Sequence, residues 1–297
     1  MKIYDCFTFF NELDLLEIRL TELYDYVDYF VIVEADKTHS GKPKEFILEK
    51  NFSRYARWKD KIIHLKVKMP KFNLFDKLLI NLERKTHGFL TRFIGSNFRM
   101  GKWKLDNFQR EQIIKGLTTC DEEDIIMISD LDEIPRAEKI SEMVSILEKS
   151  KKVGFRQTFL NHYLNGYVHD NWIGTKAVKF KTLKRELRNN PQRIRLRKFH
   201  YPLEKVGIRE KIKIIPNGGW HFNNIGKEEE VKELIVSKVE SELFKGNLER
   251  ELNKRLKSIK SLNYVDLELK PVKLDKFFPK TILKNKKKYS HLLISLE

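Results

Sequence analysis

The fold of this chain is decided by the stretch Asp124-Ile125-Ile126-Met127-Ile128-Ser129, which runs directly into Asp130-Leu131-Asp132-Glu133-Ile134-Pro135. The first half is a continuous apolar run, as expected for a strand that is buried on both faces of a parallel sheet. The second half places three carboxylates at the end of that strand, and Pro135 suits the first turn of a following helix. The stretch therefore predicts a buried strand with an acidic carboxyl end.

The segments around this strand alternate between strand-like and helix-like patterns. Strands are predicted at 2–10, 29–33 and 61–67, and helices at 13–23, 106–117 and 137–149, with Asn11 as the cap of the first helix. This alternation predicts an α/β fold, a mostly parallel sheet flanked by helices on both faces. Aromatic-rich strands at 154–167 and 177–180 predict an additional, smaller mixed sheet.

The chain is predicted to divide near residue 245. Residues 1–245 form one α/β domain, with a basic insertion at about 69–104 that contains several glycines and Pro70. Residues 246–297 are predicted to form a helical, basic C-terminal appendage that ends in a run of lysines at 284–288.

Composition excludes several classes of protein. The chain has 297 residues, and 41% hydrophobic and 11% aromatic residues are enough to build a core, which excludes a disordered chain. Cys6 and Cys120 are the two cysteines, so a disulfide framework is excluded and a reducing cytoplasm is expected. The sequence shows no signal peptide and no apolar run near 18 residues, which predicts a cytoplasmic protein with peripheral membrane contact at most.

The acidic end of the central strand has the chemistry of a metal site. In an extended segment Asp130 and Asp132 point to the same side, and two such carboxylates repel unless a cation lies between them. Hard oxygen ligands suit Mg²⁺ or Mn²⁺, and the ion would leave positions open for diphosphate oxygens. The alternative is that Asp132 or Glu133 caps the helix that follows Pro135.

Other polar residues are expected at the same edge of the sheet. Glu34 and Asp36 follow a buried strand, where they would bind a nucleoside or accept a proton. Arg110 has the guanidinium fork that suits diphosphate oxygens. Gly219 permits close approach of a ligand, and His221 is a potential third metal ligand beside Asp130 and Asp132.

Several of these segments together resemble one family. They are 3–20, 27–35, 40–44, the pairs 109–110 and 116–117, 128–135, and Gly218-Gly219-Trp220-His221-Phe222. In this order they resemble glycosyltransferase family 17, which includes β-1,4-mannosyl-glycoprotein N-acetylglucosaminyltransferases. The resemblance implies a GT-A-like (Rossmann-like) fold, a UDP-sugar donor (GlcNAc in those members), and inversion at the anomeric carbon. It also implies that Asp130 and Asp132 hold the metal and diphosphate.

An inverting transfer needs a general base for the acceptor hydroxyl. Asp170 is the first candidate, followed by Glu34 and Glu133. Trp172 and Tyr163 are expected to stack on sugar rings, with the mixed sheet forming the acceptor side. The acceptor is expected to be a glycan or glycolipid, of the kind found on bacterial surfaces.

The formal net charge of +17 favours a polyanionic partner. The basic run at 185–198, and the lysines at 284–288 beside Phe277-Phe278, are candidates for contact with an anionic membrane, at the inner face of the cytoplasmic membrane.

Two other functions remain open from the sequence. One is a metal-dependent nucleotidyltransferase or phosphohydrolase, although the chain lacks a Walker-type phosphate loop. The other is a non-enzymatic polyanion- or nucleic-acid-binding protein. The sequence shows no zinc-finger spacing, RNP motif or basic zipper, so no specific nucleic acid is expected.

Overall fold

The computed structural model describes residues 1–71, 104–195, 212–242 and 267–295, together with residues 74, 78, 253–254 and 263–264. The insertion expected at 69–104 and the first part of the expected appendage therefore lie largely outside the described residues. Within the described residues, no helix has both the length and the apolar character needed to cross a bilayer.

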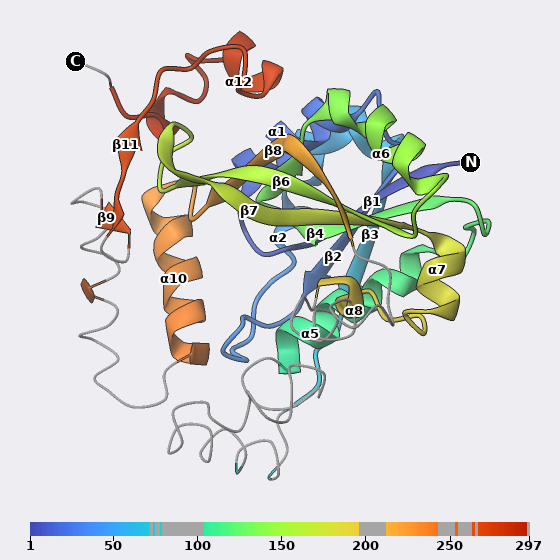
Figure 1. Ribbon diagram of the computed structural model, residues 1–297. Helices are drawn as coiled ribbons and strands as arrows, with labels where there is room; N and C mark the ends of the chain where they lie inside the picture. The colour runs from blue at the N-terminus through green and yellow to red at the C-terminus, as the bar shows by residue number, and fades with distance from the viewer. Residues whose placement is uncertain are drawn as a thin grey trace.

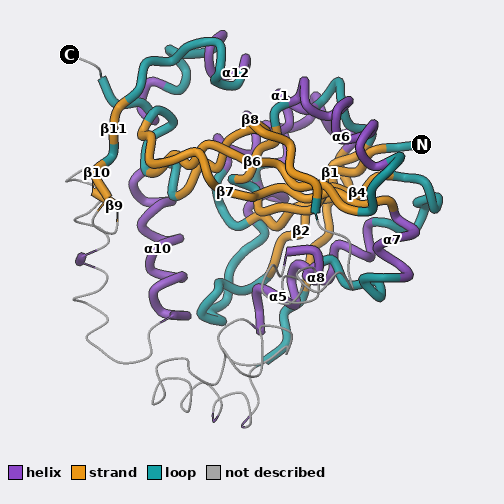
Figure 2. The backbone as a smooth tube through the Cα atoms, viewed as in Figure 1, coloured by secondary structure: helices purple, strands orange, loops and turns teal. Residues whose placement is uncertain are grey.

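Nine of the described strands form one sheet in the order β3-β2-β1-β4-β7-β6-β8-β5, with β11 paired to β7 (Figures 1 and 2). The first four are parallel: β3 (Ile62–Val67), β2 (Tyr29–Ala35), β1 (Ile3–Phe9) and β4 (Ile125–Asp130). The other strands are β7 (Gly166–Lys179), β6 (Lys152–Asn161), β8 (Lys213–Asn223), β5 (Glu133–Pro135) and β11 (Lys270–Pro271). β7 is antiparallel to β4 and β6, whereas β6 and β8 are parallel.

Helices cover both faces of this sheet, as Figure 1 shows. One face carries α1 (Leu13–Leu23), the short α2 (Ile47–Lys50), η1 (Phe52–Lys61), η4 (Ala137–Lys139) and α6 (Ile140–Leu147). The other carries α5 (Lys104–Glu111), η3 (Gln112–Gly116), α7 (Phe180–Arg185) and α8 (Gln192–Arg195). The expected α/β architecture is confirmed.

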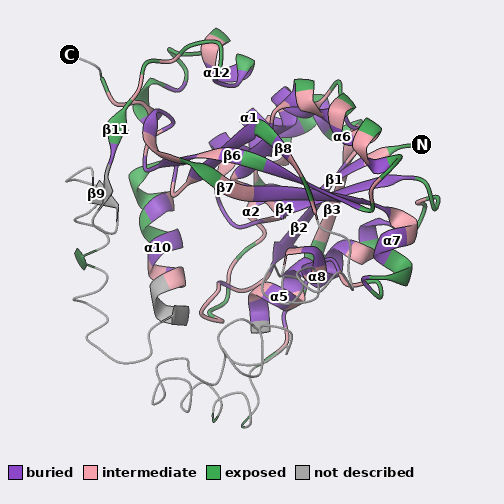
Figure 3. Cartoon of the chain, viewed as in Figure 1, coloured by how far each residue is buried: buried purple, intermediate pink, exposed green. Residues whose placement is uncertain are grey.

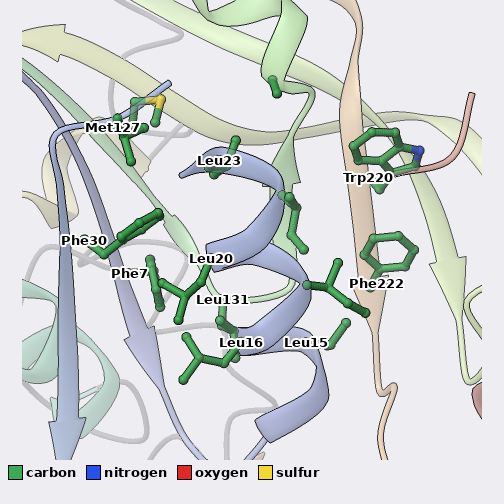
Figure 4. Packing of buried hydrophobic residues seen from close by; sticks show 14 of the residues in the cluster. Phe7, Leu15, Leu16, Leu20, Leu23, Phe30, Met127, Leu131, Trp220 and Phe222 are labelled. Atoms are coloured by element: carbon green, nitrogen blue, oxygen red, sulfur yellow. The ribbon is translucent and has the colours of Figure 1, made fainter. Parts of the chain in front are cut away.

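The core consists of two hydrophobic layers, one on each face of the sheet. Along β1, Phe7 and Phe9 belong to one layer and Tyr4 and Cys6 to the other, as the alternation of side chains in a strand requires. Figure 4 shows the leucines of α1 packed between the parallel strands and β8. In Figure 3 the inner strands β1, β2 and β4 are drawn largely as buried, and every residue of β4 except Asp130 is buried, which confirms the central strand as buried on both faces.

The structure differs from the sequence prediction in three local features. The strands expected at 154–167 and 177–180 are instead β6 and the fourteen-residue β7, and they continue the main sheet. The helix expected at 106–117 is α5 followed by the 3₁₀ turn η3. Asn11 does not cap α1, because its side chain donates hydrogen bonds to Glu230 and Glu233 of α10 (Glu228–Glu242).

The C-terminal residues pack onto the α/β core. β11, α12 (Lys280–Lys284) and η5 (Ser290–Leu292) follow the short β9 (Asn263–Tyr264) and β10 (Leu267–Glu268). Phe278, Ile282, Tyr289 and Leu292 are buried in the same hydrophobic layer as α1. The side chain of Glu22 on α1 accepts hydrogen bonds from the backbone and hydroxyl of Thr281. The domain boundary near residue 245 stays a prediction.

Candidate active site

A buried arginine shapes the turn that carries the acidic side chains. Arg19, on α1, has no exposed surface. Its guanidinium donates hydrogen bonds to both carboxylate oxygens of Asp5, to the hydroxyl of Ser129, and to the carbonyl oxygens of Asp130, Leu131 and Glu133. Because three carbonyls of one short turn converge on one guanidinium, the turn between β4 and β5 holds its side chains in fixed directions.

Asp130, at the end of β4, is held by two guanidiniums. Nη2 of Arg110 lies 2.7 Å from Oδ1 of Asp130, and Nη2 of Arg195 lies 2.6 Å from Oδ2. Burial alone would raise the pKa of Asp130, but the charges of Arg110 and Arg195 outweigh that effect and hold the pKa well below its ordinary value. Asp130 is therefore ionised at every working pH.

Glu133, the first residue of β5, belongs to the same cluster. Its carboxylate is paired with the guanidinium of Arg195, and its Oε1 accepts a hydrogen bond from the indole Nε1 of Trp172 at 2.9 Å. Its Oε2 accepts a hydrogen bond from the backbone nitrogen of Asp130 at 3.1 Å. Of the three expected general bases, Asp170, Glu34 and Glu133, only Glu133 is linked to Asp130 by contacts among the described residues.

Asp132 and His221 form a separate pair beside this cluster. Oδ2 of Asp132 lies 3.3 Å from Nε2 of His221, which is on β8. The remaining atoms of the pair, Oδ1 of Asp132 and Nδ1 of His221, are buried and have no hydrogen-bond partner among the described residues. Buried polar atoms are normally paired, so these two atoms have capacity for a hydrogen-bond partner or ligand that the described residues do not supply.

The pair fits a divalent cation in part. A carboxylate oxygen and an imidazole nitrogen are both ligands that Mn²⁺ accepts. Among the described residues, no three side chains of the metal-binding types come together in a metal-like group. Asp130 was expected to join Asp132 and His221, and instead both of its oxygens pair with guanidiniums. The residues described would therefore give a cation two ligands, and diphosphate oxygens or water would have to supply the rest.

Aromatic rings lead from the Asp132–His221 pair to the surface of β7. The ring of Trp172 lies 4.4 Å from that of His221, and Phe159 contacts both. His169 stacks on Phe159 at 5.1 Å. Phe159 is buried, whereas His169 and Trp172 are partly exposed, and partly exposed rings beside a polar pair suit stacking on a sugar ring. Tyr163 lies in the turn between β6 and β7.

The backbone geometry of β8 requires a glycine at position 219. Its φ is +143°, and a Cβ atom there would lie 2.2 Å from the carbonyl oxygen of Ile134 on β5. Only glycine allows β8 to approach β5 this closely with that backbone conformation. The residue thereby sets the position of His221, two residues further along the strand. Its expected contact with the donor stays a prediction.

The two acids at the carboxyl end of β2, Glu34 within the strand and Asp36 directly after it, bind loop segments. Glu34 is fully buried, accepts a hydrogen bond from the backbone nitrogen of Ile47 at the start of α2, and pairs with Lys44 and His64. Asp36 accepts a hydrogen bond from the backbone nitrogen of Met69 at 2.8 Å. The structure does not join either carboxylate to Asp130 or Asp132, and their expected roles stay predictions.

Asp170 lies on the opposite face of the sheet from His221. Its carboxylate accepts hydrogen bonds from the hydroxyls of Thr158 at 2.7 Å and Tyr167 at 2.9 Å. Thr158 precedes Phe159 on β6, so it points to the face away from Phe159 and His221. The structure therefore does not bring the first-choice general base together with the acidic turn.

Sequence reasoning missed several residues of the site. Arg19 and Arg195 were not linked to the acidic turn, and Glu12 was not considered. Burial raises the pKa of Glu12, and the negative charge of the nearby Asp132 raises it further. Oε2 of Glu12 accepts hydrogen bonds from the backbone nitrogens of residues 10 and 11. One signal was available, because Glu12 and Arg19 both lie in the distinctive opening segment.

Comparisons with known proteins agree with this geometry at the level of the family. Residues 1–221 match the model of Glycosyltransferase family 17. No curated protein matches the chain.

Several solved structures share its general arrangement at low similarity. A 4-diphosphocytidyl-2C-methyl-D-erythritol synthase is 10% identical, with a TM-score of 0.39, over 72% of this chain and 88% of that chain. TarS of S. aureus is 11% identical, with a TM-score of 0.37, over 88% of this chain and 71% of that chain. The glycosyltransferase GlyE of Streptococcus pneumoniae TIGR4 is 12% identical, with a TM-score of 0.34, over 92% of this chain and 66% of that chain. At these scores the likeness carries no argument about activity.

Proposed function

The chain belongs to glycosyltransferase family 17, and from this membership we propose that it is a metal-dependent, inverting transferase that moves a sugar, GlcNAc by the family resemblance, from a UDP-sugar to a glycan acceptor. The observation that carries the proposal is the Asp132–His221 pair, because its carboxylate oxygen and imidazole Nε2 lie 3.3 Å apart, close enough to bind one cation. Two arginines lie next to this pair at the carboxyl end of β4. Ligands of open α/β sheets bind at this end of the strands.

The side chains divide the work of holding the donor. Asp132 and His221 would hold Mn²⁺ or Mg²⁺, which would neutralise the charge that develops on the departing diphosphate. Arg110 keeps Asp130 ionised and adds positive charge beside the site of the diphosphate. Arg19 fixes the backbone of the turn, so the carboxylates are already oriented before the donor binds.

The acceptor hydroxyl must lose its proton to a base on the acceptor side of the donor. Glu133 lies in the cluster, but its carboxylate oxygens are already engaged by Arg195 and Trp172. Burial and the negative charge of the nearby Asp132 raise the pKa of Glu12, which is the direction expected for a group that accepts a proton. If Glu12 is the base, Glu12→Gln abolishes transfer and leaves UDP affinity within twofold. Loss of transfer in Glu133→Gln with normal UDP affinity would assign the role to Glu133 instead.

For the acceptor we propose a glycan or glycolipid of the bacterial surface type. The support is the partly exposed rings of His169 and Trp172, which pack on the buried Phe159 beside His221, because exposed rings stack on the apolar faces of sugars. Trp172→Ala is expected to raise the KM for the acceptor more than the KM for the donor. Quantifying the glycan product against both concentrations separates the two effects.

We also propose a cytoplasmic location with peripheral contact to the anionic inner face of the cytoplasmic membrane. The support is the charge of +17, together with Phe277, which is 55% exposed beside lysines of the C-terminal segment. Co-sedimentation with vesicles of anionic lipid, but not with vesicles of neutral lipid, is the expected result. Equal sedimentation with both would contradict an electrostatic contact.

Donor binding is the decisive test. We expect one UDP-sugar among UDP-GlcNAc, UDP-Gal and UDP-Glc to raise the melting temperature with Mn²⁺ and not with EDTA, and GDP-Man to have no effect. A ligand at one hundred times its Kd stabilises by about 2.7 kcal/mol. Asp132→Asn, which keeps the shape of the side chain, should lose this shift. Asp60→Asn, an exposed acid outside the site, is the matched control and should keep it.

Two outcomes would overturn the proposal. An equal rise in melting temperature with EDTA and with Mn²⁺ would show that donor binding does not need a metal. Binding of a free nucleoside triphosphate with release of pyrophosphate, and no transfer of sugar from any donor, would favour the nucleotidyltransferase alternative.

A further inference from the structure

The strongest unexplained feature of the site is the convergence of two guanidiniums on one carboxylate. Arg110 pairs with Oδ1 of Asp130 and Arg195 with Oδ2. Arg195 also pairs with Glu133, and Arg110 with Asp106. Two positive and three negative groups thus form one network at the end of β4.

The network is expensive in desolvation. Arg110 is 5% exposed and Glu133 is 1% exposed. Taking such charges out of water costs several kcal/mol per ion, and their mutual attraction often only offsets that cost. Stability therefore gives a poor account of this cluster, and a binding role gives a better one.

The two arginines have different surroundings. The nitrogens Nη1 and Nη2 of Arg110 donate to Asp106, Asp130 and Gln192, the last at 2.5 Å, so both terminal nitrogens of this side chain are engaged by the protein. The side chain of Arg195 is 15% exposed and that of Asp130 is 34% exposed. Of the two guanidiniums, that of Arg195 is therefore the more exposed to a ligand from solvent, and the Asp130 carboxylate beside it is also partly exposed.

The position of Arg195 is set by the neighbouring helices. It is the last residue of α8, and Gln192 at the start of α8 accepts the hydrogen bond from Arg110 of α5. Arg110 thus anchors the short helix that presents Arg195, while also holding Asp130. This gives the two arginines separate tasks, one positioning and one available for a ligand.

We propose that Arg195 is a ligand of the donor's diphosphate, held ready by Asp130 and Glu133 until the donor arrives. Two oxygens of a phosphate group accept a pair of hydrogen bonds from a guanidinium, as the two oxygens of Glu133 now do from Arg195. On binding, Arg195 exchanges a carboxylate for a phosphate, and Asp130 keeps Arg110 as its partner. The inference rests on the proposed function, because it takes the ligand to be a nucleoside diphosphate.

Calorimetric binding of UDP and UMP to the full chain tests this assignment. In Arg195→Gln, the Kd for UDP is expected to rise at least tenfold, while the Kd for UMP rises less than threefold. Arg185→Gln is the matched control. It removes the same charge from a side chain that is 69% exposed and paired only with Glu122 among the described residues, and it should leave both constants unchanged.

A second variant, Arg195→Lys, distinguishes loss of the phosphate contact from loss of folding. Arg195→Lys keeps the positive charge beside Asp130 and Glu133 and loses the fork, so its affinity for UDP should lie between those of the unmodified protein and Arg195→Gln. Equal weakening of UDP and UMP in both variants, or no weakening in either, would overturn the inference alone. Absence of UDP binding by the unmodified protein would remove the proposed function, and the inference with it.

Discussion

Arg19 connects three parts of the fold through one side chain. It pairs with Asp5 on β1 and donates to the backbone of the acidic turn, and both Arg19 and Asp5 are fully buried. Removing one partner of such a pair leaves an uncompensated buried charge. The site chemistry and the stability of the fold therefore depend on the same residue.

Arg19→Met is expected to lower the free energy of unfolding by about 3–5 kcal/mol, because Asp5 is left without its partner. Adding Asp5→Leu should recover part of that loss, so the double variant should be more stable than Arg19→Met alone. Urea denaturation of the four proteins of the cycle measures the coupling. Additive effects of the two substitutions would contradict the expected dependence of Asp5 on Arg19.

Gly219→Ala tests the contact between β8 and β5. The added Cβ would meet the carbonyl oxygen of Ile134 at 2.2 Å, and the φ of +143° adds strain, so we expect a loss of about 3 kcal/mol or more. Gly226→Ala is the control, because its Cβ would meet mainly the flexible end of Glu230 at 3.0 Å and should cost less than about 1 kcal/mol. Similar melting temperatures for the two variants would refute the steric argument.

The site was predictable where its signal is local. Asp130 and Asp132 follow an apolar strand within a few residues, so sequence alone indicated their edge of the sheet. Arg195 lies 65 residues from Asp130, and no local pattern links the two. Asp130 pairs with Arg110 and Arg195, whereas Asp132 pairs with His221. Because this difference depends on residues distant in the sequence, the shared metal site expected from the spacing of the two aspartates could not be tested by sequence alone.

At the scale of elements, β7 contains a β-bulge that makes the side-chain directions differ from those the sequence alternation predicts. Asp170 and Trp172 are two residues apart, which predicts the same face in a regular strand. β6 and β7 change register between the pairs Phe159–His169 and Gln157–Trp172, so β7 carries an extra residue there. A β-bulge of this kind reverses the alternation, and Trp172 faces His221 while Asp170 faces away. The sequence carries no marker of that bulge.

The turn between β6 and β7 gives a pH-dependent prediction. His162 has a φ of +62° and is 6% exposed, and burial lowers its pKa to about 4. The unfolded chain takes up the proton near pH 6.5, so stability is full above that pH and is lost as pH falls towards 4. The loss from this one group is expected to reach about 3 kcal/mol.

His162→Asn should flatten this part of the stability profile, because asparagine accepts the left-handed backbone and does not titrate. Denaturant unfolding at pH 7, 5.5 and 4 measures the effect. His169→Asn, on the neighbouring strand, is the matched control and should leave the slope between these pH values in place. An unchanged slope in His162→Asn would show that another group causes the pH dependence.

At the scale of the whole molecule, the C-terminal segment was the least predictable part. Its lysines indicated a basic surface, and residues 284, 286 and 287 are exposed as that pattern implies. The sequence predicted a helical appendage there, and no local pattern indicated that four of its apolar residues enter the main core. Their partners lie on α1, more than 250 residues earlier, so only the tertiary structure brings them together.

Removal of residues 270–297 should therefore cost far more than a surface tail would. Burial of Phe278, Ile282, Tyr289 and Leu292 contributes at most about 6–12 kcal/mol, a large part of the stability of an ordinary domain. We expect the truncated chain to be unfolded or to melt at least 10 °C lower, as circular dichroism would show. The variant with glutamine at Lys284, Lys286 and Lys287 should melt normally and bind anionic vesicles more weakly. A truncated chain that melts like the intact one would show that the family-matched residues fold independently of the segment that packs on them.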